Sequence, residues 1–121
     1  MENRLSTLAL PEASRTQVLA VASQYASEVR SHFGDRLRDI RLFGSAARGD
    51  WNRDSDVDVL VLLDSVSEAD SDWLVRRALR LGLLENHLLL QPAILPEHEF
   101  VELRARERRF AVDIETEGRR L

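Results

Sequence analysis

The sequence contains no cysteine among its 121 residues, which excludes a disulfide framework and a thiolate metal site. No apolar run approaches the roughly 20 residues that a membrane-spanning helix requires. The N-terminus lacks the basic-then-apolar pattern of a secretion signal, so we expect a cytoplasmic protein. Internal repeats, low-complexity tracts and Pro/Gly-rich linkers are also missing. A chain of this length is expected to form one domain, residues 1–121, around one modest core.

The composition is that of an ordinary globular protein, with 44% apolar and 31% charged residues. The formal net charge of −4 argues against a surface built to contact nucleic acid directly.

The pattern of apolar residues predicts alternating helices and strands. Residues 14–33 have helical spacing, and Gly34 supplies a stop. A short strand is expected over 39–44 and a loop over 45–55, with one helical turn at 45–48. The nearly continuous apolar run from Asp56 to Leu63 is typical of a strand covered on both faces.

The second half begins with Ser67 and Asp70, whose S-x-x-D spacing forms a capping box for a second long helix. That helix should end near Gly82 or Asn86. A third strand is expected over 87–95, with Pro92 indicating an edge position or a bulge. The last helix should begin at 96–97 and bury apolar residues up to a frayed end near Gly118. The residues expected to be buried there are Phe100, Leu103, Phe110 and Ile114. The order is helix, strand, short helix, strand, helix, strand, helix: an α/β or α+β domain.

Two acids, Asp56 and Asp58, open the most apolar segment of the chain. On a strand, residues two apart share a face and lie roughly 7 Å apart, from a rise of about 3.3 Å per residue. Carboxylates this close repel each other unless a cation lies between them, and oxygen ligands of this kind suit Mg²⁺. A pair of solvent-facing acids at a strand end is the alternative, and the pair alone does not decide between them.

Gly44 and Ser45 favour the metal-site interpretation of these acids over a pair of solvent-facing acids. A glycine followed by a helical turn exposes backbone N–H groups that suit a phosphate, and Ser45 can add a hydroxyl donor. If the strands before Gly44 and after Asp56 run antiparallel, this turn and the acids meet at one end of the sheet. Together they are the minimum equipment for phosphoryl or nucleotidyl transfer.

Two further side chains in the loop have more than one interpretation. Arg48 lies three residues after Ser45, so it could hold a phosphate oxygen or pair with Asp50 or Asp54. Trp51 could stack on a base, dock against a partner or tuck onto the domain surface.

The spacing of Gly44-Ser45, ten intervening residues and Asp56-Val57-Asp58 resembles the G-S-x10-D-x-D signature of the polymerase-β-like nucleotidyltransferases. The stretch GSAARGDWNRDSDVDVLV is similar to the minimal nucleotidyltransferase (MNT) branch in particular. The order of elements fits as well, so the resemblance covers nearly the full chain. It implies the polymerase-β-like fold, with a small mixed sheet covered by helices.

The resemblance also implies residue roles and a partner. Asp56 and Asp58 would be catalytic and bind Mg²⁺, and Gly44 and Ser45 would hold the β- and γ-phosphates of ATP, with Arg48 assisting. Small MNT proteins are often encoded beside a HEPN-domain ribonuclease toxin. They act there as antitoxins, in a hetero-oligomer, by transferring AMP from ATP to a toxin tyrosine. Relatives that modify aminoglycosides or tRNA carry further domains that this length cannot hold.

One position departs from the family pattern. The family usually has a third acid on the strand after the second long helix, but HLLLQPAIL (87–95) contains none, and Gln91 matches that position best. A glutamine carbonyl can ligate a metal but cannot accept a proton near neutral pH. Two hypotheses follow: an enzyme whose base comes from the partner or from water, and an antitoxin that neutralises its partner by binding alone.

Overall fold

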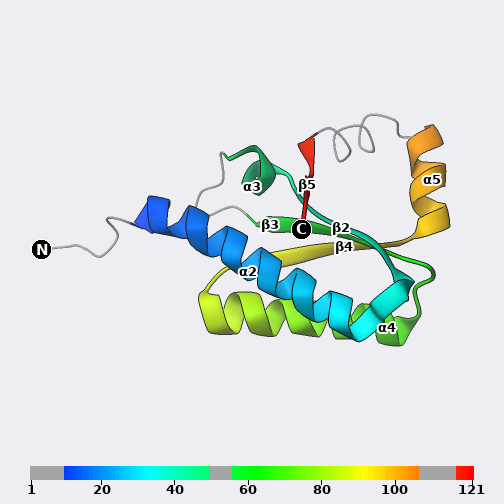
Figure 1. Ribbon diagram of the computed structural model, residues 1–121, viewed down its shortest axis with the longest axis horizontal. Helices are drawn as coiled ribbons and strands as arrows, with labels where there is room; N and C mark the ends of the chain where they lie inside the picture. Colours follow the sequence, from blue (N-terminus) through cyan, green and yellow to red (C-terminus); the bar gives the residue numbers. More distant parts are fainter. Residues whose placement is uncertain (1–9, 50–55, 107–116) are drawn as a thin grey trace, which may run out of the picture.

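A four-stranded mixed sheet lies at the centre of the computed structural model, which describes residues 10–49, 56–106 and 117–121 (Figure 1). Its strands, in the order β4-β3-β2-β5, are β4 (Leu90–Pro96), β3 (Val57–Leu63), β2 (Leu37–Phe43) and β5 (Arg119–Arg120). β2 runs antiparallel to both β3 and β5, whereas β3 and β4 are parallel. The predicted α/β class and small mixed sheet are therefore confirmed.

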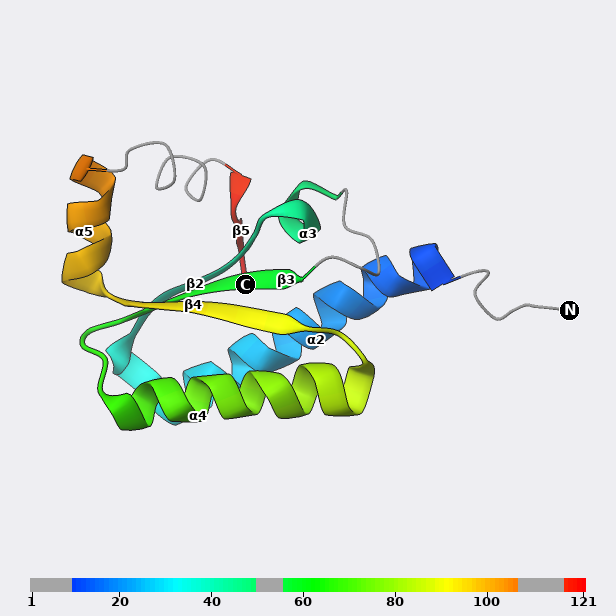
Figure 2. The same cartoon turned by 180° about the vertical axis from the view of Figure 1, so that it is seen from behind.

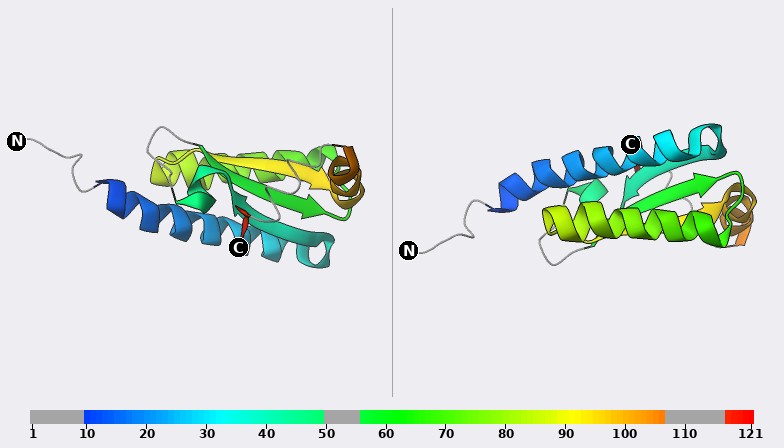
Figure 3. Two further views of the ribbon diagram at one scale, coloured as in Figure 1. Left: turned by 90° about the horizontal axis from the view of Figure 1, so that it is seen from above. Right: turned by 90° about the horizontal axis from the view of Figure 1, so that it is seen from below.

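Two long helices lie side by side across one face of the sheet (Figure 3). They are α2 (Leu10–Phe33) and α4 (Glu68–Ala78), and a π-helical segment, η2 (Leu79–Leu84), continues α4. The shorter α5 (Glu97–Arg106) lies on the opposite side of the sheet from α4 (Figure 2). A single turn, α3 (Ser45–Arg48), follows β2, and the 3₁₀ turn η1 (Gly34–Arg36) precedes it. None of the described helices has the length and hydropathy needed to cross a membrane.

The buried apolar residues of α2 lie on one side of the helix, and that side faces the core. Val18, Ala22, Tyr25, Val29 and Phe33 are all buried, as the helical period predicts. The helix ends at Phe33, and the next residue, a glycine, has a φ of +56°, which confirms the predicted stop. The helix begins at Leu10, one residue before Pro11, a residue that suits a helix start, and before the stretch 14–33 whose spacing predicts the helix.

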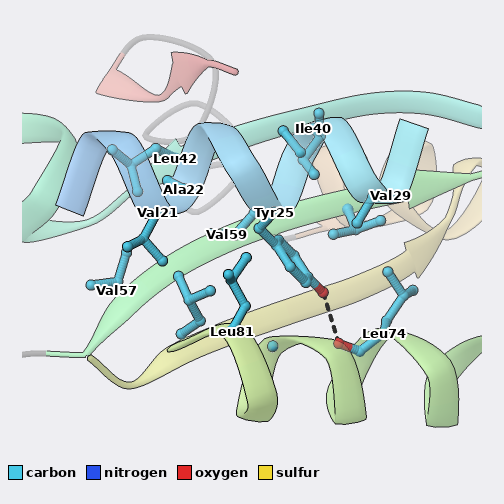
Figure 4. Close-up of a cluster of buried hydrophobic side chains, with 14 of the residues drawn as sticks. Val21, Ala22, Tyr25, Val29, Ile40, Leu42, Val57, Val59, Leu74 and Leu81 are labelled. Carbon is cyan, nitrogen blue, oxygen red and sulfur yellow. Dashed lines mark hydrogen bonds between the residues drawn. The ribbon is translucent and has the colours of Figure 1, made fainter. Parts of the chain in front are cut away.

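The strand β3 is buried on both faces, which explains its continuous apolar sequence. Its alternate residues Val57, Val59, Val61 and Leu63 join the core under α2 and α4. Leu60, on the other face, packs with a second cluster that includes residues of β4 and α5. A hydrogen bond in the central core also links α2 to α4. The buried Tyr25 hydroxyl donates to the Leu74 carbonyl over 2.8 Å (Figure 4).

The capping box at the start of α4 is confirmed. The Asp70 N–H donates to the Ser67 hydroxyl over 3.1 Å, and the Ser67 N–H donates to the Asp70 carboxylate over 3.0 Å. Arg36 also donates to Asp70 over 2.7 Å and to Asp64 over 3.0 Å, so it ties η1 to both ends of the β3–α4 connection.

The structure corrects several predicted boundaries. β3 begins at Val57, so Asp56 precedes the strand. β4 covers 90–96 instead of 87–95, because His87 adopts a φ of +56° that interrupts an extended strand. Pro92 lies in an edge strand, as predicted. β5 was not predicted at all, and Phe110 and Ile114 lie outside the described residues.

Candidate active site

Gly44 and Asp58 meet at the end of the sheet where β2 finishes and β3 begins. The condition set by the sequence analysis is met, because β2 and β3 pair antiparallel, with Phe43 opposite Asp58 and Gly44 immediately after Phe43. A Cβ built on Gly44 would lie only 2.6 Å from Oδ2 of Asp58, and Gly44 has a φ of +73°. The missing side chain therefore permits both the left-handed turn and the close approach of the carboxylate to the backbone.

The turn after Gly44 is the predicted helical turn, α3. The Arg48 N–H donates to the Gly44 carbonyl over 3.2 Å, which closes the turn. Ala46 and Ala47 pack against the main core, and this packing holds the turn in position on the domain. The side chain of Ser45 lies outside the part of the chain that the structure describes, and its phosphate-binding role stays a prediction.

The two acids differ in their surroundings. Asp56 is exposed, whereas Asp58 is half-buried on β3. Burial raises the pKa of Asp58 above its usual value, and the negative charge of Asp56 raises this pKa further. Only Asp58 lies on the strand as expected, because Asp56 precedes β3, but the charge of Asp56 still acts on the Asp58 carboxyl.

This donor set fits Mg²⁺. A half-buried carboxylate repelled by a second acid gains from a cation held between them, and both ligands are hard oxygens. Within residues 10–49, 56–106 and 117–121, no group of three or more His, Cys, Asp or Glu side chains gathers that could hold a metal. A two-acid site leaves coordination positions open, and Mg²⁺ commonly fills these with phosphate oxygens and water.

Gln91 is the neighbour of Asp58 on the other side. The parallel pairing of β3 with β4 places these two residues opposite each other, so Phe43, Asp58 and Gln91 form one row across three strands. Gln91 is exposed. This register agrees with the position that the sequence suggested for it. Its amide is neutral, so among the three side chains of the row only Asp58 can carry a charge or accept a proton.

Arg48 forms an ion pair that sequence reasoning missed. Its Nη1 lies 3.5 Å from Oε1 of Glu117, and both side chains are about half exposed. Glu117 reaches this place because the segment that contains it leads into β5, which pairs with β2. The strand β5 has only two residues, which is too short for an alternating pattern that would predict a strand from the sequence. Asp50, Asp54 and Trp51 lie outside the described residues.

A mixed sheet with a glycine turn and two acids at one end is the arrangement expected of a nucleotidyl-transferring protein. A family model described as "Nucleotidyltransferase domain" matches residues 22–120. Because this match covers most of the chain, and Gly44, Asp56, Asp58 and Gln91 with it, the protein belongs to the nucleotidyltransferase domain family.

Individual relatives agree with this assignment. Two proteins of Methanocaldococcus jannaschii, each named "Putative protein adenylyltransferase", are 27% and 30% identical. The first match covers 64% of this chain and 79% of the relative, and the second covers 54% and 66%. A Sulfolobus solfataricus crystal structure named as a "putative nucleotidyltransferase" has a TM-score of 0.51 and 26% identity, covering 76% of this chain and 78% of that chain.

The fold is also found in a solved "toxin-antitoxin with AMP-PNP", with a TM-score of 0.53 and 20% identity. That likeness covers 80% of this chain and 69% of the other chain. At this identity it bears on the fold alone.

Proposed function

We propose that this nucleotidyltransferase is Mg²⁺-dependent and moves AMP from ATP to a tyrosine hydroxyl of a partner HEPN ribonuclease toxin, acting as its antitoxin. The observation that carries the proposal is the approach of Gly44 to the half-buried Asp58 carboxylate, with Asp56 beside it. The protein adenylyltransferase names of two relatives favour AMP transfer to a protein. The toxin–antitoxin complex that shares the fold favours a toxin as the acceptor.

In this proposal Asp56 and Asp58 hold the magnesium ion, and the backbone of Gly44 with Ser45 binds the phosphates. Bound Mg²⁺ would supply positive charge that offsets the phosphate oxygens. Arg48 would leave Glu117 and add a second positive charge. The acceptor oxygen forms a bond to the α-phosphorus, the bond to the bridging oxygen breaks, and pyrophosphate leaves. Because the neighbouring Gln91 is neutral, the hydroxyl proton passes to water or to a base of the partner.

Gln91 favours a second candidate, an antitoxin that keeps the fold and neutralises its partner by binding alone. General-base assistance is typically worth about 10²–10⁴ in rate. A chain without that assistance transfers AMP slowly, and occlusion of the toxin could then be its whole effect.

One experiment separates the two candidates. The protein is incubated with the product of the adjacent gene, Mg²⁺ and ATP labelled at the α-phosphate, and label on the partner is measured alongside toxin activity. The double variant Asp56→Asn/Asp58→Asn should transfer no label. Asp72→Asn, which removes an exposed acid of α4, is the matched control and should behave as wild type. If wild type and the double variant block the toxin equally and no label moves, the binding candidate replaces the enzyme.

The variant Gln91→Glu tests the role of the row Phe43, Asp58 and Gln91. A carboxylate at position 91 would provide the missing base next to Asp58, so we expect faster transfer above the pKa of the new acid. If the rate of Gln91→Glu equals that of wild type even well above the unperturbed Glu pKa of about 4.3, where the new carboxylate is ionised, proton removal does not limit the reaction.

A further inference from the structure

Arg15, near the start of α2, lies against the end of the turn that follows Gly44. A Cβ built on Gly49 would be 2.9 Å from Nη1 and 3.3 Å from Nη2 of Arg15. Gly49 has a φ of +88°, so its backbone is turned in a way that side chains rarely allow, and the guanidinium occupies the space where a side chain would be. One turn later on α2, Val18 is 3% exposed in the core, which fixes the position of this part of the helix.

The charge of Arg15 is not used within the described protein. Among residues 10–49, 56–106 and 117–121, its guanidinium has no hydrogen-bond or ion-pair partner, and the side chain is exposed. Arg48, on the same turn as Gly49, is in contrast already paired with Glu117. Among the described residues beside this turn, Arg15 is therefore the arginine whose guanidinium has no partner.

We propose that Arg15 binds the terminal phosphates of the nucleotide, an inference that rests on the proposed function of the Gly44–Asp58 site. A nucleoside triphosphate brings several negative charges to a place that already holds Asp56 and Asp58. Magnesium offsets part of that charge, and a guanidinium offsets more while its planar N–H groups can grip two phosphate oxygens at once. Sequence reasoning could not find this residue, because an exposed arginine on a helix carries no local signal of a ligand.

The test compares two probes, AMP-PNP and AMP, each with Mg²⁺, by calorimetric titration of the purified protein. Arg15→Gln should weaken AMP-PNP binding about tenfold, which corresponds to about 1.4 kcal/mol, and should change AMP binding less than about twofold. Arg15→Lys keeps the charge but loses the planar grip, so we expect a loss between wild type and Arg15→Gln. Arg80→Gln is the matched control, because Arg80 is exposed, lies in η2, and its side chain also has no partner among the described residues.

Each outcome decides a separate question. If wild type binds AMP-PNP and Arg15→Gln binds it equally well, the role of Arg15 is overturned while the proposed site stands. Equal losses for AMP-PNP and AMP would also overturn it, since Arg15 would then act only by shaping the turn at Gly49. If wild type binds neither probe, the proposed site and this inference fail together. Should Arg15→Gln not fold, Arg15→Lys is judged by the same ratio of the two affinities.

Discussion

Replacing Gly44 with alanine tests the close approach on which the candidate site depends. The new Cβ would lie 2.6 Å from Oδ2 of Asp58, closer than real Cβ atoms come to such neighbours. Two costs add. The left-handed backbone at a φ of +73° costs an alanine roughly 1–2 kcal/mol. Forcing the half-buried carboxylate aside costs about 1–3 kcal/mol, the usual range for overpacking. We therefore expect Gly44→Ala to lower the free energy of unfolding by about 2–5 kcal/mol.

Gly34→Ala is the control, because Gly34 also has a positive φ but has open space where a Cβ would lie. Gly34 has a φ of +56°, and nothing lies within 4 Å of a Cβ built there. Its replacement should cost only the backbone part, roughly 1–2 kcal/mol. The Asp58→Ala background supplies the second control. Without the carboxylate, the nearest remaining Asp58 atom is Cβ at 3.7 Å, so Gly44→Ala should there cost as little as Gly34→Ala.

Urea unfolding monitored by circular dichroism measures these differences at equilibrium, and AMP-PNP titration reports the site. Gly44→Ala should lose nucleotide affinity, and Gly34→Ala should keep it. The reasoning is refuted if Gly44→Ala costs no more than Gly34→Ala, or if its cost is the same with and without the Asp58 carboxylate.

Three further predictions concern the core, a salt bridge and the acid pair. Tyr25→Phe removes the buried hydrogen bond to the Leu74 carbonyl and should lower stability by about 1 kcal/mol in urea unfolding; an unchanged midpoint would contradict this. The hydrogen bonds from Arg36 lower the pKa of Asp70, so their stabilisation is present above the ordinary Asp pKa of about 3.9 and is lost as the pH falls toward the lowered value. Arg36→Gln should therefore lower the free energy of unfolding at pH 7 and have less effect below about pH 4, and a loss that is constant with pH would contradict the pairing. Burial and Asp56 raise the pKa of Asp58, so ionising this carboxylate destabilises the folded state as pH rises above the ordinary Asp value. Asp58→Asn should then raise the melting temperature at pH 7 by a few degrees without metal, and this gain should vanish on acidification; a melting temperature below wild type at pH 7 would refute it.

Much of the candidate site follows from short-range patterns. The continuous apolar run predicts β3 as a doubly covered strand, and both of its faces are buried. The short connection between the two strands allows an antiparallel return from Gly44 to Asp58, and Phe43 does pair with Asp58. The resemblance to the family implies that Gln91 stands at the position of the third acid, and the register places it opposite Asp58. These features depend on residues close in sequence, or on strands joined by one connection.

Other features depend on contacts between distant parts of the chain. The ion pair of Arg48 with Glu117 joins residues from opposite halves, and β5 is too short to leave a pattern. The strand β4 begins three residues later than predicted because His87 turns into the left-handed region, which its neighbours in the sequence do not reveal. Asp56 falls just before β3, since a strand boundary depends on hydrogen bonding to neighbouring strands.

The class of fold, the glycine turn and the acid pair can be predicted from the sequence, because apolar period, capping and turn chemistry are local properties of a chain. The distance from Gly44 to the Asp58 carboxylate, the pairing of Arg48 with Glu117 and the approach of Arg15 to the turn at Gly49 depend on the tertiary structure. These are distances between segments that meet only when the helices pack on the sheet. Packing is set by the whole core at once, so no short stretch of sequence contains it.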